Sequence, residues 1–143
     1  MDIGTCRVHK LVVDVALLAA RQVLLVRYRD PAAYDQQRGW FLPDDYLKPL
    51  EHPDDAAARI LTEQAGLRVP AARLHHIESF GNGAWHLIFH YTAEIIRPLP
   101  VVPGPNTAEA RWFSLTALPD RAEMAHEGWG LDVLRTILTR SAG

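Results

Sequence analysis

Alternating apolar and polar residues along the chain predict a set of strands. Five segments are predicted as strands by this alternation or, in the first two, by apolar runs: 11–20, 22–29, 74–80, 85–96 and 110–113. In the second segment both alternating faces are largely apolar, which is typical of a strand buried at the centre of a sheet. The sequence Gly81, Asn82, Gly83 predicts a hairpin turn between the third and fourth segments.

A helical repeat of apolar residues predicts two helices, at residues 53–65 and 127–140. In the first, Ala57, Ala58, Leu61 and Ala65 share one face, which we expect to pack on the sheet. A proline is compatible with the first turn of this helix and a glycine follows its last residue. The order of strands, helix, strands and helix predicts one α/β or α+β domain over residues 1–143.

Composition and charge narrow the class of protein. The 143 residues are 48% hydrophobic and 22% charged, with a net charge of −2, which is typical of a folded domain without a basic surface. Binding to a nucleic acid polymer or to an anionic membrane is therefore not expected, whereas a small nucleotide needs only local donors. The single cysteine, Cys6, excludes an internal disulfide and favours a cytoplasmic location.

Residues 40–67 carry a recognisable motif. It resembles the Nudix box: Gly, five residues, Glu, seven residues, then Arg-Glu-apolar-any-Glu-Glu-any-Gly-apolar. The positions that match with this spacing are Glu51, Arg59, Leu61, Glu63, Gly66 and Leu67. The box region is 45–67, the preceding Trp40, Leu42 and Pro43 match the strand that leads into it, and residues 109–119 resemble the family's penultimate strand and turn.

The resemblance implies a fold and an activity. The fold is the Nudix α/β/α sandwich, with a mixed sheet between helices. The activity is that of a MutT-like pyrophosphohydrolase, which uses Mg²⁺ or Mn²⁺ to cleave nucleoside diphosphate derivatives. The resemblance also implies that a homodimer is possible.

The box departs from the family pattern at the residues that hold the metal. Ile60 and Gln64 stand where the family has glutamates, and Asp44 and Asp45 replace Gly-Gly. We expect Ile60 to place hydrocarbon at the metal site and Gln64 to offer an oxygen without charge. Mg²⁺ prefers several carboxylate oxygens, so Glu63 alone would hold it weakly.

Other residues could replace the missing glutamates as metal ligands. Asp44 and Asp45 have two interpretations: solvated residues of a turn with positive φ, or a turn in which Asp45 supplies a metal ligand. The metal candidates are therefore Glu63, Asp45 and Gln64. The catalytic candidates are Glu63, Arg59 and Glu109, and we expect the loop at Glu109 to close over the same helix face as Glu63.

Four further residues are candidates for substrate binding: Trp40, Glu51, His126 and Glu127. Trp40 has the alternative role of a core residue, and Glu51 that of an ion-pair partner of Arg59. We interpret His86 and His90 as ordinary histidines on a polar face, because they would lie about 13 Å apart along a strand. The same interpretation applies to the neighbouring pair His75 and His76.

Two classes of function remain open. In the first, the protein is a weak or inactive relative that binds a nucleotide-like ligand or a protein partner. In the second, it is an active Mg²⁺-dependent hydrolase with relocated metal ligands. The fold alone does not choose between them, because one scaffold can carry both functions.

Overall fold

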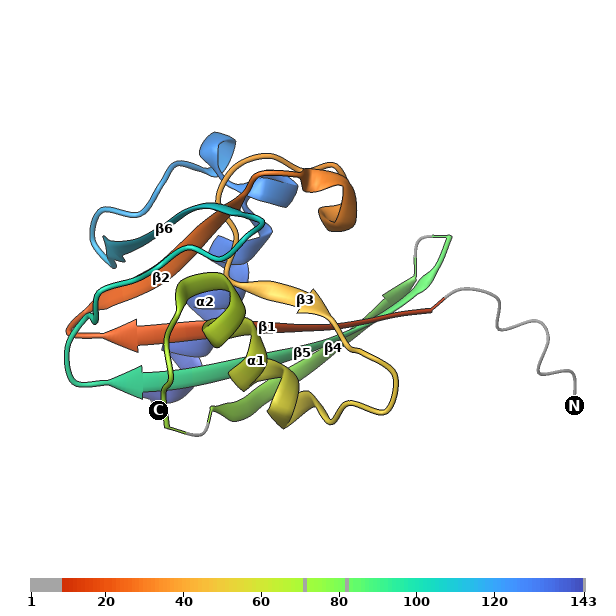
Figure 1. The fold of residues 1–143 in the computed structure, drawn as a ribbon, viewed down its shortest axis with the longest axis horizontal. Helices are drawn as coiled ribbons and strands as arrows, with labels where there is room; N and C mark the ends of the chain where they lie inside the picture. The colour runs from red at the N-terminus through yellow and green to blue at the C-terminus, as the bar shows by residue number, and fades with distance from the viewer. Residues whose placement is uncertain (1–8, 71, 82, 143) are drawn as a thin grey trace, which may run out of the picture.

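The computed structural model describes residues 9–142 except 71 and 82 (Figure 1). Cys6 and Asn82 therefore lie outside the described residues. The strands are β1 (His9–Ala19), β2 (Gln22–Tyr28), β3 (Asp44–Tyr46), β4 (Arg73–Gly81), β5 (Trp85–Ile95) and β6 (Thr107–Ser114). The α-helices are α1 (Pro53–Ala65) and α2 (Trp129–Ala142), and short 3-10 helices lie at Pro31–Tyr34, Arg121–Glu123 and Ala125–Gly128.

The described strands form one mixed sheet. Its order is β4-β5-β1-β2-β6, with β3 paired to β1. β1 runs parallel to β5, and the other pairs are antiparallel. β1 and β2 pair only at Leu18 with Val23 and at Ala19 with Gln22, and then separate. The segment that contains β3 fills the gap, because Phe41 bridges to β2 while β3 pairs with β1.

The two helices cover opposite faces of the sheet (Figure 1). Alternate residues of β1 supply the two cores, as the pleat of a strand requires. Val13, Val15 and Leu17 pack with α1, whereas Ala16 and Leu18 pack with α2. The α/β/α sandwich implied by the resemblance is confirmed.

The predicted helix 53–65 is confirmed at both ends. His52 caps its first turn through a side-chain nitrogen, and Gly66 ends it with a φ of 67°. The second helix begins later than predicted, at Trp129, because His126 and Glu127 have positive φ values of 50° and 55°. Two residues in the left-handed region cannot continue a right-handed helix.

The turn expected at Asp44 and Asp45 is wrong. Both residues belong to β3, where they pair with Asp14 and Val13 of β1. Neither is among the residues with positive φ. Hydrogen bonds to β1 therefore fix an extended backbone in place of the tight turn that glycines would allow.

Gly104 holds the loop between β5 and β6 against the end of α1. A Cβ at this position would lie 1.7 Å from the carbonyl oxygen of Glu63. We expect Gly104→Ala to lower the free energy of unfolding by about 1–3 kcal/mol, the usual cost of overpacking. Urea unfolding would measure this change. The control is Gly81→Ala, whose Cβ would come no closer than 3.8 Å to the atoms around it, and an equal loss in both variants would contradict the prediction.

Candidate functional site

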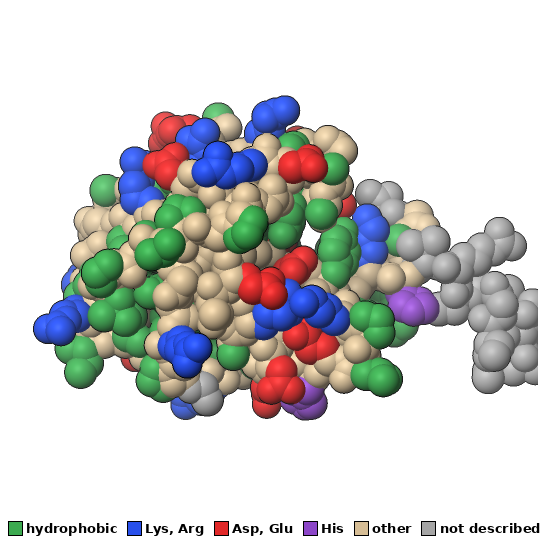
Figure 2. Space-filling model, viewed as in Figure 1, with side chains coloured by type: hydrophobic (Ala, Val, Ile, Leu, Met, Phe, Trp, Pro, Cys, Tyr) green, Lys and Arg blue, Asp and Glu red, His purple; other side chains and the backbone are tan. Residues whose placement is uncertain are grey.

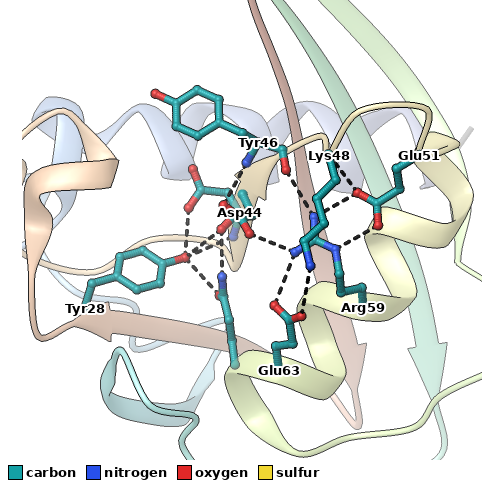
Figure 3. A network of polar contacts seen from close by, with 9 residues as sticks. Tyr28, Asp44, Tyr46, Lys48, Glu51, Arg59 and Glu63 are labelled. Atoms are coloured by element: carbon teal, nitrogen blue, oxygen red, sulfur yellow. Dashed lines mark hydrogen bonds and ion pairs between the residues drawn. The ribbon is translucent and has the colours of Figure 1, made fainter.

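Arg59 is the centre of a network of polar contacts between α1 and β3 (Figure 3). Its Nε and Nη2 donate to the two carboxylate oxygens of Glu51, at 2.8 and 3.0 Å. Its Nη1 donates to Asp45 at 2.8 Å and to Glu63 at 3.2 Å, and Nη2 also donates to the carbonyl of Tyr46. The Glu51–Arg59 pair expected from the sequence is present, and the same guanidinium also ties together Asp45 and Glu63.

Charges within this network compensate one another. The side chains of Arg59 and Glu51 are only 13% and 14% exposed. Their hydrogen bond raises the pKa of Arg59 and lowers the pKa of Glu51, so both stay charged near neutral pH. Glu63 is half exposed and also lies 3.7 Å from the ammonium of Lys48. Acidic and basic side chains accordingly lie side by side on the face that carries α1 (Figure 2).

Gln64 is anchored by a second set of hydrogen bonds. Its amide nitrogen donates to the carbonyl of Asp44 at 2.8 Å, and its amide oxygen accepts from the Tyr28 hydroxyl at 2.9 Å. That hydroxyl also lies 2.8 Å from Oδ1 of Asp44. Burial raises the pKa of the Asp44 carboxyl well above its usual range. The hydrogen bonds of the buried Gln64 side chain therefore join α1 to β2 and β3.

Ile60 lies in the core and not on an exposed face of α1 beside the half-exposed Glu63. Its side chain is fully buried in the core between α1 and the sheet, with Ala57 and Leu61. The buried face of α1 includes Ile60 and Gln64 as well as Ala57 and Leu61, whereas Ala58, which was predicted on this face, is exposed. Ile60 lies on the side of α1 that covers the sheet, and its hydrocarbon stabilises the core.

A cavity of about 750 Å³ opens on the α2 side of the sheet. Its lining includes the aromatic residues Tyr34, Phe41, Tyr46, Phe80 and Trp129, together with Lys10, Gln37, His126 and several acidic residues. Asp44 and Asp45 line it as well, whereas Glu63 and Arg59 are not among its described lining residues. The cavity and the box network therefore meet at β3.

Three predicted site residues lie away from Glu63. Glu109 pairs with Arg27 at 3.5 Å and Arg111 at 3.7 Å. Both guanidinium groups lie over the ring of Trp40, which is 4% exposed and packs in the core beneath α2. Glu109 is thus on the opposite face of the sheet from Glu63, and the expected convergence is wrong. Trp40 is a core residue, and exposed Glu127 is not among the described cavity residues.

His126 is the predicted substrate-binding residue that the structure places in the cavity wall. Its ring lies 5.9 Å from Phe41 and 6.3 Å from Trp129, measured between centroids. Its Nε2 lies 3.4 Å from Asp35, another lining residue. Burial lowers the pKa of His126, so the imidazole is mostly neutral at neutral pH.

A buried histidine cluster was missed by the sequence analysis. His90 is fully buried, so its interpretation as a polar-face residue is wrong. Its Nδ1 lies 2.7 Å from Asp14, and its Nε2 lies 2.7 Å from Glu78. His76 pairs with His90 across β4 and β5, and burial lowers the pKa of His76 to about 4. Asp14, a carboxylate within an apolar run, was the signal in the sequence that could have led to this cluster.

The pKa values of the buried pair follow from the same contacts. Burial alone would lower the pKa of His90, but the hydrogen bond and charge of Asp14, with the charge of Glu78, raise it above its usual value. Burial raises the pKa of the Asp14 carboxyl, although the contact with His90 opposes this effect.

Comparison with known proteins agrees with this fold. The chain matches the NUDIX domain model over residues 8–132 and belongs to the Nudix family. No curated protein shows significant sequence similarity to it. No helix in the described part of the chain is long and apolar enough to cross a membrane.

Solved structures with a similar fold include three of particular interest. A MutT/nudix family protein from Enterococcus faecalis is 25% identical, with a TM-score of 0.63 over 73% of this chain and 43% of that chain. The NUDIX domain of Shewanella oneidensis NrtR, complexed with ADP ribose, is 18% identical, with a TM-score of 0.76 over 98% of this chain and 93% of that chain. The third is a bifunctional NMN adenylyltransferase/ADP ribose pyrophosphatase from Francisella tularensis, complexed with AMP and a Mn ion. It is 16% identical, with a TM-score of 0.73 over 94% of this chain and 42% of that chain. The chain thus spans less than half the length of the first and third proteins.

Nudix hydrolases generally use divalent metals such as Mg²⁺ or Mn²⁺, but the box of this chain fits such an ion poorly. Asp45 and Glu63 share the same nitrogen of Arg59, and Glu63 also faces Lys48. The amide oxygen of Gln64 accepts a hydrogen bond from Tyr28. Cations already compensate the two carboxylates, whereas a hydrated Mg²⁺ needs free oxygen ligands.

Proposed function

We propose that this protein binds a nucleoside diphosphate derivative and hydrolyses it weakly or not at all. The observation that carries the proposal is the position of Arg59, whose guanidinium binds Asp45, Glu51 and Glu63 together. A metal ion at the box would have to displace this guanidinium or share its carboxylates. The family scaffold is retained, while the charges that would attract the ion are neutralised.

The cavity supports the binding half of the proposal. Its volume of about 750 Å³ lies within the range of small-molecule sites. Aromatic rings such as Phe80 and Trp129 suit the face of a nucleobase. Lys10, whose ammonium lies 3.3 Å from Asp35, is the lining lysine that a phosphate could engage. A structural neighbour of the chain, the NrtR domain, is complexed with ADP ribose. ADP ribose is therefore the first ligand that we would test.

A second candidate is the active hydrolase with relocated ligands. It is favoured by one observation: Asp45 and Glu63 lie within 2.8 and 3.2 Å of the same Arg59 nitrogen, so their carboxylates converge. An ion that displaced this nitrogen would find two carboxylate ligands together. Glu63 and Asp45 are then the proposed metal ligands, without a contribution from Glu109 on the other face.

Calorimetric titration with ADP ribose in the presence of Mg²⁺ tests the binding. We expect one ligand per chain, and at least about a fivefold loss of affinity in Phe80→Ala, because stacking on a base contributes about 1–3 kcal/mol. The control is Trp85→Ala. Both aromatic residues are similarly exposed, at 42% and 47%, but Trp85 is not among the described lining residues.

An assay for AMP formed from ADP ribose in the same samples decides between the two candidates, because cleavage of the pyrophosphate linkage gives AMP and ribose 5-phosphate. Turnover that is absent, or barely above the rate without protein, supports the binding function. Mg²⁺-dependent turnover that Glu63→Gln abolishes supports the hydrolase with relocated ligands. If wild type binds none of a panel of nucleoside diphosphate derivatives, or if Phe80→Ala and Trp85→Ala weaken binding equally, the proposed site is wrong.

A further inference from the structure

A second possible metal site lies on the α2 side of the sheet, away from the box helix. His76, Glu78 and His90 offer ligand atoms that all lie within 4.8 Å of one another. We propose that these three residues bind a divalent transition-metal ion of the Zn²⁺ class. None of the three residues belongs to the Arg59 network, whereas Glu78 also lines the cavity that is proposed to bind the nucleotide.

The pairing of β4 with β5 creates this arrangement. His76 stands directly opposite His90 in the register, and their ring centroids are 4.5 Å apart. Glu78 lies two residues further along β4, on the same face of the strand, and its carboxylate comes within 2.7 Å of Nε2 of His90. A register shift between Leu74 and His76 interrupts the ladder beside the cluster, as is often found near functional sites.

The donor set matches zinc rather than magnesium. Two imidazoles and one carboxylate form a three-residue ligand set of the kind found in catalytic zinc sites. Tetrahedral ligands at about 2.0–2.2 Å from Zn²⁺ are about 3.3–3.6 Å apart. The contact between His90 and Glu78 would therefore lengthen by less than about 1 Å to admit the ion, a change within reach of side-chain rotation. Mg²⁺ prefers oxygen ligands and binds poorly to two imidazoles.

Asp14 is a positioning residue for this site. Its Oδ1 lies 2.7 Å from Nδ1 of His90, and both side chains are almost completely buried. With the Nδ1 proton donated to Asp14, the ion would replace the proton that Nε2 of His90 shares with Glu78 and would accept the lone pair of Nε2. A carboxylate that orients a ligating histidine in this way is the usual support of a zinc ligand.

The fourth position of the ion would face the cavity. The Glu78 side chain is 36% exposed and belongs to the cavity lining, whereas His90 lies behind it. The ring of Trp129 lies 5.5 Å from that of His90 and covers it from the side of α2. A water molecule, or an oxygen of a molecule in the cavity, could thus complete the tetrahedron.

Zinc titration in excess Mg²⁺ tests the site, because Mg²⁺ occupies carboxylate-only positions. We expect wild type to bind one Zn²⁺ per chain, and His76→Gln and Glu78→Gln each to bind it at least about 100-fold more weakly. Asp14→Asn should weaken binding about 10–100-fold, the range for a lost supporting residue. The matched control is His86→Gln, on β5 and in the cavity wall but outside the cluster, with an expected change below about threefold.

Co²⁺ absorption and thermal unfolding supply independent readouts. Co²⁺ bound to wild type should give the intense visible bands of tetrahedral coordination, and these should persist in Asp14→Asn at saturating Co²⁺ but not in Glu78→Gln. Zn²⁺ should also raise the Tm of wild type, because it binds only the folded chain at this site.

The proposal is overturned if wild type binds no Zn²⁺ and shows no Tm shift. It is also overturned if folded His76→Gln or Glu78→Gln keeps the wild-type affinity, and either variant alone suffices for this test. The presence or absence of ADP ribose binding does not change these outcomes, so the two proposals fail separately.

Discussion

Ile60→Glu is expected to lower the free energy of unfolding by about 3–5 kcal/mol and to leave hydrolase activity no higher than in wild type. The side chain at this position is fully buried in the core with Ala57 and Leu61. A glutamate there would be a buried charge without a partner, and such a charge lowers stability by about 3–5 kcal/mol. The variant restores the family's residue in sequence, but it damages the core before it can bind a metal.

The double variant Ile60→Glu, Gln64→Glu sharpens the test. Gln64 donates its amide hydrogen to the carbonyl of Asp44 at 2.8 Å. A carboxylate cannot donate this hydrogen bond, and it would face a carbonyl oxygen across a buried contact. We therefore expect the double variant to be less stable than Ile60→Glu alone, with no gain in Mg²⁺-dependent turnover.

Urea unfolding with a matched control measures the effect. Ala58→Glu places the same charge on α1 two residues earlier, at an exposed position, and should change stability by less than about 0.5 kcal/mol. If Ile60→Glu loses as little as Ala58→Glu, or if a folded double variant gains activity, then residue 60 does lie at a metal site as the sequence suggested.

The fold could be predicted because its signals are local. The helix at residues 53–65 has a capping residue, an apolar face and a terminal glycine, and the structure reproduces its bounds. The central strands could be recognised from their alternating or wholly apolar faces. The segment at Asp44 and Asp45 could not, because its strand forms only by pairing with β1, which is distant in sequence.

The site was less predictable for a physical reason. The box spacing identified Arg59, Glu51 and Glu63, whose contacts with one another lie within one helix and the loop before it. The role of Ile60 depends on how wide a face of α1 the sheet covers, which a helical repeat does not specify. The environment of His90 depends on the register between β5 and its neighbours β1 and β4.

Arg59→Gln is expected to lower the free energy of unfolding by about 3 kcal/mol, near the lower end of the range for breaking a buried ion pair. The Glu51 carboxylate, 14% exposed, would lose both of its guanidinium hydrogen bonds, and Asp45 would lose one. Glutamine is too short and carries no charge to replace them. The matched control is Arg27→Gln, whose ion pair with Glu109 is about half exposed and should contribute no more than about 1 kcal/mol.

Acid unfolding gives a signature that only the charge pair would produce. The hydrogen bond from Arg59 lowers the pKa of Glu51 below its usual 4.5 in the folded state. A group with a lowered folded pKa stabilises the protein above its unfolded pKa, and this stability is lost as the pH falls through the folded value. The free energy of unfolding should therefore fall more steeply in wild type than in Arg59→Gln between about pH 5 and 3. Parallel curves for the two proteins would mean that Arg59 does not stabilise the fold through the charge of Glu51.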